Sequence, residues 1–135
     1  MTPKPSTVVD LVWIDALKFS TVSRPQIIID SAGAAGPSPV EALGLALAGC
    51  MSVDVAHILS RGRRPLRAMR AQLVGDRAQE DPHRFLYVAL HLTIEGDVPA
   101  GAVERAIRLS REKYCSVWHS MRQDIDFQVT FDLVP

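Results

Sequence analysis

The feature that most constrains the fold is the apolar segment from Val40 to Val53, VEALGLALAGCMSV, which carries a single charge at Glu41. A membrane-spanning helix needs about 20 apolar residues, so this segment of 14 residues is too short to cross a bilayer. Helix-start signals precede it: Ser38 can cap, Pro39 suits the first helical position, and Glu41 completes a capping box. The segment predicts a helix over residues 38–60 that is surrounded by protein.

Strand-forming segments occur in groups before and after this helix. Most are rich in β-branched or aromatic residues, and residues 85–94 alternate apolar and polar side chains. The expected strands cover 8–14, 17–21, 26–30, 66–73, 85–94 and 126–133. An amphipathic helix is expected over 100–113, followed by a short helical piece at 117–122. The order βββ-α-ββ-α-α-β predicts an α+β fold with a largely antiparallel sheet, in a single domain covering residues 1–135.

The composition limits the partners that the chain is expected to have. Its 15 Lys and Arg residues balance 15 Asp and Glu residues, so no basic excess is available to neutralise phosphates. Neither a nucleic acid nor a membrane is therefore an expected partner. Two cysteines are too few for a disulfide scaffold, and no basic and then apolar leader opens the chain at residues 1–5. We therefore expect a cytoplasmic location, where thiols stay reduced.

The two cysteines lie in different settings. Cys50 lies in the middle of the apolar helix, and Asp54 follows it by four residues. Cys115 lies at a helix break, and His119 follows it by four residues. A buried free cysteine is most often a small core hydrophobe, and apolar surroundings raise the pKa of a thiol. A buried thiol facing a second thiol is also what a peroxidatic and resolving pair requires, because a sulfenic acid must find a thiol within disulfide reach. The residues alone leave both interpretations open.

Three segments in a fixed order carry a family resemblance. They are SPVEALGLALAGCMSVDVAHIL (38–59), GDRAQEDPHRF (75–85) and AVERAIRLSREKYCSV (102–117). They resemble the consecutive signature segments of the OsmC/Ohr family, the osmotically inducible and organic-hydroperoxide-resistance proteins. The resemblance spans nearly the whole chain. It implies an OsmC-like α+β fold with antiparallel sheets around two central helices, and an intertwined homodimer with active sites at the subunit interface.

The resemblance also implies an activity, the thiol-dependent reduction of organic and inorganic hydroperoxides in defence against oxidative stress. Cys50 takes the position of the peroxidatic thiolate, and Cys115 takes that of the resolving thiol. The thiolate would attack the hydroperoxide, the resolving thiol would condense with the resulting sulfenic acid, and an external dithiol would reduce the disulfide. No metal, flavin or haem cofactor is implied.

One position departs from the pattern of the best-characterised peroxidases of the family. Those proteins have a Pro-Glu pair before the helix, and the Glu pairs with an N-terminal Arg that steadies the thiolate. Here Val40 follows Pro39, and the carboxylate falls one residue later at Glu41, which resembles the YhfA-like branch of the family. Because a helix turns about 100° per residue, Glu41 faces elsewhere, and its role as a capping-box partner is an alternative.

Several polar groups could tune the thiolate. The candidates are Glu41, Lys18, Arg24 and His119. For Lys18 and Arg24 the alternative is an ordinary exposed charge on a sheet. Asp54 and His57 could polarise the thiol of Cys50, or they could form a buried structural pair.

An apolar pocket for a lipid-like hydroperoxide is expected from four side chains, and core packing is the alternative for each. They are Leu43, Leu47, Met51 and Trp118. Three functional classes remain: the peroxidase, a non-catalytic homodimer that binds or scavenges an apolar or thiol-reactive small molecule, and a structural homodimer with unreactive thiols. We favour the peroxidase, whose partners would be a second copy of the chain, a small hydroperoxide and an external dithiol.

Overall fold

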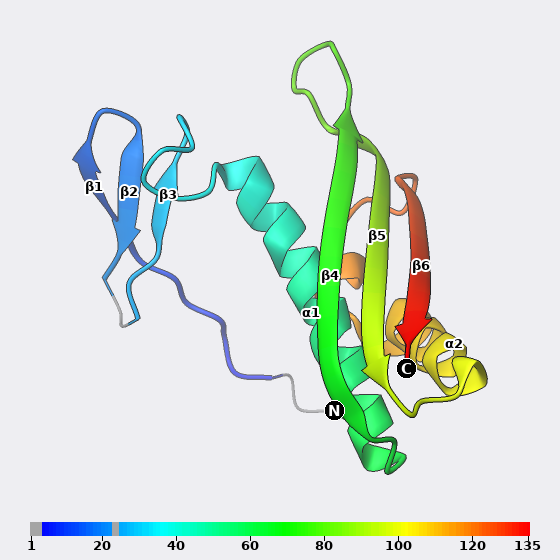
Figure 1. Cartoon of the computed structure of the whole chain (residues 1–135). Helices are drawn as coiled ribbons and strands as arrows, with labels where there is room; N and C mark the ends of the chain where they lie inside the picture. The colour runs from blue at the N-terminus through cyan, green and yellow to red at the C-terminus, as the bar shows by residue number, and fades with distance from the viewer. Residues whose placement is uncertain (1–3, 23–24) are drawn as a thin grey trace. The chain divides into compact units, whose positions relative to one another are not determined.

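The computed structural model describes residues 4–22 and 25–135. These residues form two compact units, Met1–Leu43 and Gly44–Pro135 (Figure 1). The assignment of residues 1–135 to a single domain stays a prediction.

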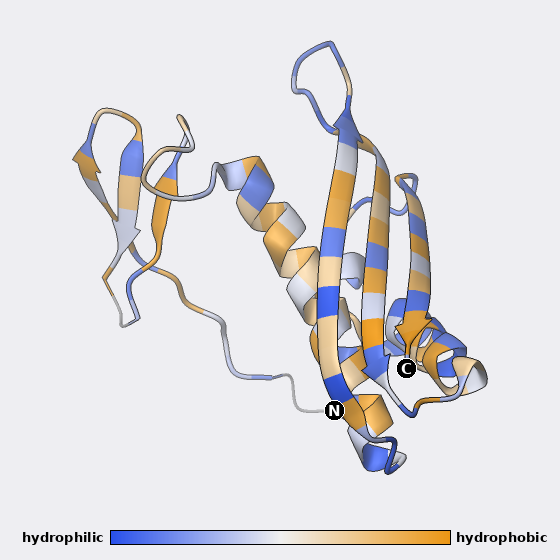
Figure 2. Cartoon of the chain, viewed as in Figure 1, coloured by the Kyte–Doolittle hydropathy of each residue, from blue (hydrophilic) through white to orange (hydrophobic). Residues whose placement is uncertain are grey.

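The first unit contains a small antiparallel meander. Strands β1 (Leu11–Asp15), β2 (Lys18–Thr21) and β3 (Ile28–Asp30) pair in that order. They are shorter than the three predicted strands but lie within or beside them. All five residues of β1 are exposed in this chain, including Trp13 at 60%. The apolar residues on these strands (Figure 2) are therefore poorly covered within the meander itself.

The loop after β3 is held by side-chain hydrogen bonds and leads to the predicted helix start. The Asp30 carboxylate accepts hydrogen bonds from the backbone N–H groups of Ala32 and Ala35, each at 2.9 Å. Ser38 and Glu41 then form a capping box, because the backbone N–H of each residue donates to the side chain of the other at 3.1 Å. This capping box confirms the predicted start of helix α1 (Pro39–Arg61).

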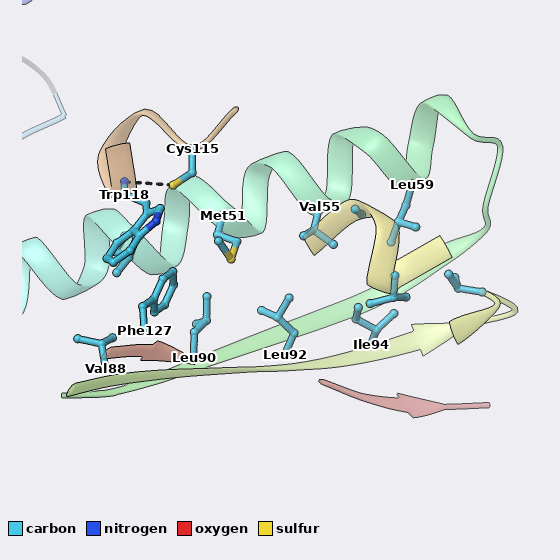
Figure 3. Close-up of a cluster of buried hydrophobic side chains, with 14 of the residues drawn as sticks. Met51, Val55, Leu59, Val88, Leu90, Leu92, Ile94, Cys115, Trp118 and Phe127 are labelled. Atoms are coloured by element: carbon cyan, nitrogen blue, oxygen red, sulfur yellow. Dashed lines mark hydrogen bonds between the residues drawn. The ribbon is translucent and has the colours of Figure 1, made fainter. Parts of the chain in front are cut away.

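From Gly44 onward, helix α1 is part of the second unit and packs into its core through one face. Its buried residues recur every three or four positions and are Gly44, Leu47, Met51, Val55 and Leu59. Figure 3 shows side chains of this face pointing toward Leu90, Leu92 and Ile94 on β5. The prediction of a helix surrounded by protein is therefore wrong for the chain by itself, since Leu45 and Val53 on the other side are 63% and 67% exposed.

Of the helices in the described residues, α1 is the one long and apolar enough to cross a membrane by length and composition. The core helix of a soluble protein meets the same criterion, and five residues of α1 are buried within the second unit.

The second unit is a three-stranded mixed sheet with its helices. Strands β4 (Leu66–Arg77) and β5 (Phe85–Gly96) are antiparallel, and β6 (Asp126–Val134) pairs with β5 in parallel. Apolar and polar residues alternate along β5 (Figure 2), and its inward residues are buried. With one parallel pair among the four described, the sheets are largely antiparallel, as expected. Helical segments between β5 and β6 form the crossover that a parallel pair requires. The predicted α+β class and element order are confirmed.

The predicted second helix is divided into two parts. Helix α2 (Ala100–Leu109) is followed by a π-helical turn, η1 (Ser110–Tyr114), and then by the short helix α3 (Ser116–His119). At the end of η1 the backbone N–H of Cys115 donates to the carbonyl oxygen of Ser110 at 2.8 Å, five residues back. The helix break predicted around Cys115 is therefore a π-turn followed by a new helix start.

Candidate active site

Two elements of the second unit bring the cysteines together. Helix α1 carries Cys50 and, one turn later, Asp54, while Cys115 lies at the junction of η1 and α3. The two Sγ atoms and a carboxylate oxygen of Asp54 all lie within 4.8 Å of one another. Both thiols are free. Residues 65 positions apart in sequence thus share one small polar cluster in an apolar core.

Cys115 is fixed by the backbone around it. It is the N-cap residue of α3 with an extended backbone, and its Sγ accepts a hydrogen bond from the backbone N–H of Trp118 at 3.4 Å (Figure 3). Its side chain is fully buried, whereas Cys50 is partly exposed. Cys50 is therefore the more accessible thiol for a molecule arriving from solvent.

The surroundings of Cys115 favour its neutral form. Burial raises the pKa of the Cys115 thiol to about 11, and the neighbouring Cys50 side chain and the Asp54 carboxylate act in the same direction. The hydrogen bond from the Trp118 N–H opposes this shift but does not cancel it. At neutral pH Cys115 is therefore a protonated thiol and needs a base before it can act as a nucleophile.

Asp54 has a hydrogen-bond partner that the sequence analysis missed. The hydroxyl of Ser110 donates to Oδ2 of Asp54 at 2.7 Å, and Ser110 is fully buried. A sequence signal for this contact did exist, because Ser110, directly after α2, continues the apolar face that Val103 and Ala106 form on that helix. A hydroxyl on a buried face generally has a polar partner. The alternative pairing of Asp54 with His57 is not what the structure has, since His57 is exposed on the helix.

Three of the other candidate tuning groups have partners outside the thiol cluster. Glu41 forms the capping box with Ser38. The Nζ of Lys18 lies 2.9 Å from Asp15, which raises the Lys18 pKa. The Nε2 of His119 lies 3.0 Å from the carbonyl oxygen of Arg111. The remaining candidate, Arg24, lies outside the described residues.

The residues expected to line a pocket differ in exposure. Leu47, Met51 and Trp118 are buried in the core at 1%, 0% and 4% exposure, and Trp118 packs against Phe127 with ring centroids 4.6 Å apart (Figure 3). Leu43 is 41% exposed. The three buried side chains thus pack in the core, which was the alternative to a pocket for each of them. Their contribution to a substrate pocket stays a prediction.

The cluster lies within the part of the chain that matches a known family. The family described as OsmC-like protein matches residues 31–130, which include both cysteines and Asp54. The chain belongs to the OsmC-like family. Protein YhfA of Escherichia coli K12 is 34% identical to this OsmC-like chain over 126 residues, covering 90% of the chain and 94% of YhfA. The resemblance inferred from the sequence is therefore confirmed.

Solved structures agree with this family assignment. A hypothetical protein from Aquifex aeolicus VF5 superposes with a TM-score of 0.89 and 25% sequence identity. The aligned region covers 97% of the OsmC-like chain and 98% of the Aquifex protein. An organic hydroperoxide resistance protein OsmC from Legionella pneumophila has a TM-score of 0.73 and 15% identity, with coverage of 96% and 99%. The second comparison shows the shared fold alone. Together they confirm that the α+β architecture is OsmC-like.

Proposed function

We propose that this OsmC-like protein is a thiol-dependent peroxidase that reduces organic and inorganic hydroperoxides through Cys50 and Cys115, in defence against oxidative stress. The observation that carries the proposal is the cluster itself, in which the two free thiols and the Asp54 carboxylate lie within 4.8 Å. A disulfide needs an S–S distance of about 2 Å, so only a small movement separates the two sulfur atoms from a bond.

The first step falls to Cys50 because it is the partly exposed thiol. Its thiolate attacks the outer oxygen of the hydroperoxide, the O–O bond breaks, and the alcohol leaves after taking up a proton. Cys50 is oxidised to a sulfenic acid, and the hydroperoxide is reduced by two electrons. Water takes the place of the alcohol as the product when the substrate is hydrogen peroxide.

The second step falls to Cys115, which is buried and protonated. Its sulfur attacks the sulfur of the Cys50 sulfenic acid, forming the disulfide and releasing the hydroxyl group as water. Asp54 is the positioned base: it takes the thiol proton and passes it to the departing hydroxyl, with Ser110 holding the carboxylate in place. An external dithiol then reduces the disulfide and is itself oxidised.

The test measures hydroperoxide consumption with a dithiol present. Cys50→Ser is expected to lower consumption to the background rate, because the attacking atom is lost. With the dithiol left out, Cys115→Ser is expected to reduce about one hydroperoxide per chain quickly and to leave a sulfenic acid that dimedone traps, because neither the resolving thiol nor an external thiol is present to react with it. Full turnover by Cys50→Ser would contradict the proposal.

A second candidate is a non-catalytic protein that binds or scavenges an apolar or thiol-reactive small molecule. The interactions of Glu41 and Lys18 favour this second candidate. Glu41 is bonded to Ser38 and Lys18 is paired with Asp15, so neither side chain is engaged in stabilising a thiolate. Mass spectrometry of the native protein without peroxide separates the two candidates. A retained ligand, together with unchanged peroxide levels when a dithiol is present, would support binding over catalysis.

We further propose that the protein acts as a homodimer in the cytoplasm. The apolar side of α1 opposite its buried face supports a second copy as the partner, because Leu45 and Val53 are exposed in the single chain. Cys50 lies between these two residues on the same helix, so the partner would border the thiol cluster.

A further inference from the structure

We propose that the reduced thiol pair and Asp54 form a binding site for one zinc ion or a zinc-like divalent cation. The site consists of two cysteine sulfurs and one carboxylate oxygen, all within 4.8 Å of one another. Across residues 4–22 and 25–135 it is the one group of three or more Cys, His, Asp or Glu side chains close enough to share an ion. The inference is independent of the peroxidase proposal, because it concerns binding by the resting, reduced protein.

The donor atoms suit this class of ion. Zinc accepts thiolate and carboxylate ligands, whereas calcium and magnesium take oxygen ligands. Zn–S bonds of about 2.3 Å and Zn–O bonds of about 2.1 Å in a tetrahedron place the donor atoms about 3.6–3.8 Å apart. The three atoms of the cluster lie within 4.8 Å, so side-chain movements of about 1 Å suffice to reach that geometry. Each thiol loses its proton to solvent on binding, and no redox step is involved.

The surroundings of the ligands are already ordered. The Ser110 hydroxyl donates to one oxygen of Asp54 at 2.7 Å and so orients the carboxylate. The Trp118 N–H donates to Cys115 Sγ at 3.4 Å, a contact that orients the sulfur. Hydrogen bonds of this kind to ligand atoms are typical of zinc sites and usually change metal affinity about 10–100-fold.

The set of three protein ligands leaves a fourth position for water. Cys50 and Asp54 are both partly exposed, so an ion can enter from their side while Cys115 closes the site from within the core. Three protein ligands and a water are the arrangement of a catalytic zinc site rather than of a closed structural one. Metal binding and disulfide formation exclude each other, because both use the two sulfur atoms.

The experiment titrates Zn²⁺ and Co²⁺ into the reduced, metal-free full chain without thiol reductant and without peroxide. We expect one Zn²⁺ per chain in competition with a chromogenic chelator. Bound Co²⁺ should show thiolate-to-metal charge-transfer absorption and the intense visible bands of a tetrahedral site. Protein oxidised to the Cys50–Cys115 disulfide should neither bind Zn²⁺ at this site nor show these Co²⁺ absorption bands. These readouts use the wild-type chain, so they do not depend on whether a variant folds.

Variants identify the ligands. Cys50→Ser, Cys115→Ser and Asp54→Asn should each weaken Zn²⁺ binding at least about 10-fold, and Ser110→Ala should weaken it by about 10–100-fold. Asp97→Asn is the matched control, because it makes the same substitution at an exposed carboxylate outside the cluster.

His91→Asn is the second control, because it removes an exposed His–Asp132 pair, 3.1 Å apart, that could hold a surface ion. Both controls should bind as the wild type does. A wild-type Co²⁺ complex without thiolate absorption would overturn the proposal, as would unchanged binding by Asp54→Asn.

Discussion

Cys115 and Cys50 are chemically unlike, although their sulfur atoms are neighbours. Cys115 is fully buried and has a pKa of about 11, while Cys50 is partly exposed. At pH 8 a thiol with a pKa of about 11 is ionised in about one molecule in a thousand. The same burial that makes Cys115 a poor nucleophile toward solvent keeps it available for a neighbouring sulfenic acid.

Alkylation of the reduced protein, with a chelator present, tests this difference. Iodoacetamide at pH 8 should label Cys50 at least about 10-fold faster than Cys115. The reagent must reach the sulfur atom and reacts with the thiolate form, and Cys115 is both buried and protonated. Raising the pH toward 11 should increase the labelling of Cys115, since its thiolate fraction grows through that range. Peptide mass spectrometry gives the two rates. Equal rates at pH 8 would show that the buried, protonated description of Cys115 is wrong.

At the scale of elements, the π-turn η1 decides where Cys115 lies. It inserts a wider turn between α2 and α3, so that the Cys115 N–H reaches the carbonyl oxygen of Ser110. Such turns contain one residue more than an α-helical turn and often lie at functional sites. The turn also lets one segment present both the Ser110 hydroxyl and the Cys115 thiol to the cluster.

Inserting an alanine after Glu112, an exposed residue of η1, tests this role. The insertion lengthens the turn by one residue beyond the π-turn and should rotate Cys115 and α3 by about 100° relative to α2. We expect near-native far-ultraviolet circular dichroism and diamide-induced Cys50–Cys115 crosslinking that is at least about 10-fold slower. The substitution Glu112→Ala is the control and should crosslink at the wild-type rate. If the insertion variant crosslinked as fast as the control, the length of the π-turn would not be what positions Cys115.

The elements differ in how far local sequence determines them. Helix α1 and its start were predictable because Ser38, Pro39 and Glu41 act on their immediate neighbours. Strand β5 was predictable because its alternation is continuous. The π-turn and the parallel pairing of β6 were not, because both depend on how the chain packs after α2. The Cys50–Cys115 pairing came from family resemblance, and the Asp54–Ser110 contact joins residues 56 positions apart, which spacing alone does not reveal.

At the scale of the whole molecule, the exposed apolar side of α1 needs an explanation. Leu45 and Val53 lie two turns apart on one side of the helix, and each keeps more than half of its surface exposed. Exposed apolar side chains that gather along one face commonly mark an interface. Helix α1 would then have one face in its own core and the other against a second copy, which would satisfy the predicted burial on all sides.

Replacing Leu45 and Val53 together by Glu tests this arrangement. Burying unpaired carboxylates in an apolar interface costs at least about 3 kcal/mol, which corresponds to a dimer weakened about 100-fold or more. Light scattering after size-exclusion chromatography should therefore give twice the 14.8 kDa chain mass for the wild type and the single-chain mass for the variant. Circular dichroism checks that the variant keeps its secondary structure.

The matched control replaces Gln72 and Gln79, both exposed on or beside the β4–β5 hairpin, by Glu. It introduces the same two charges and should remain dimeric, because net charge alone does not separate the subunits. If the α1 variant stayed dimeric as well, the second copy would have to bind elsewhere. Cys50 lies between the two replaced residues, so a second copy bound elsewhere would not cover it. The accessibility of Cys50 would then depend on this chain alone.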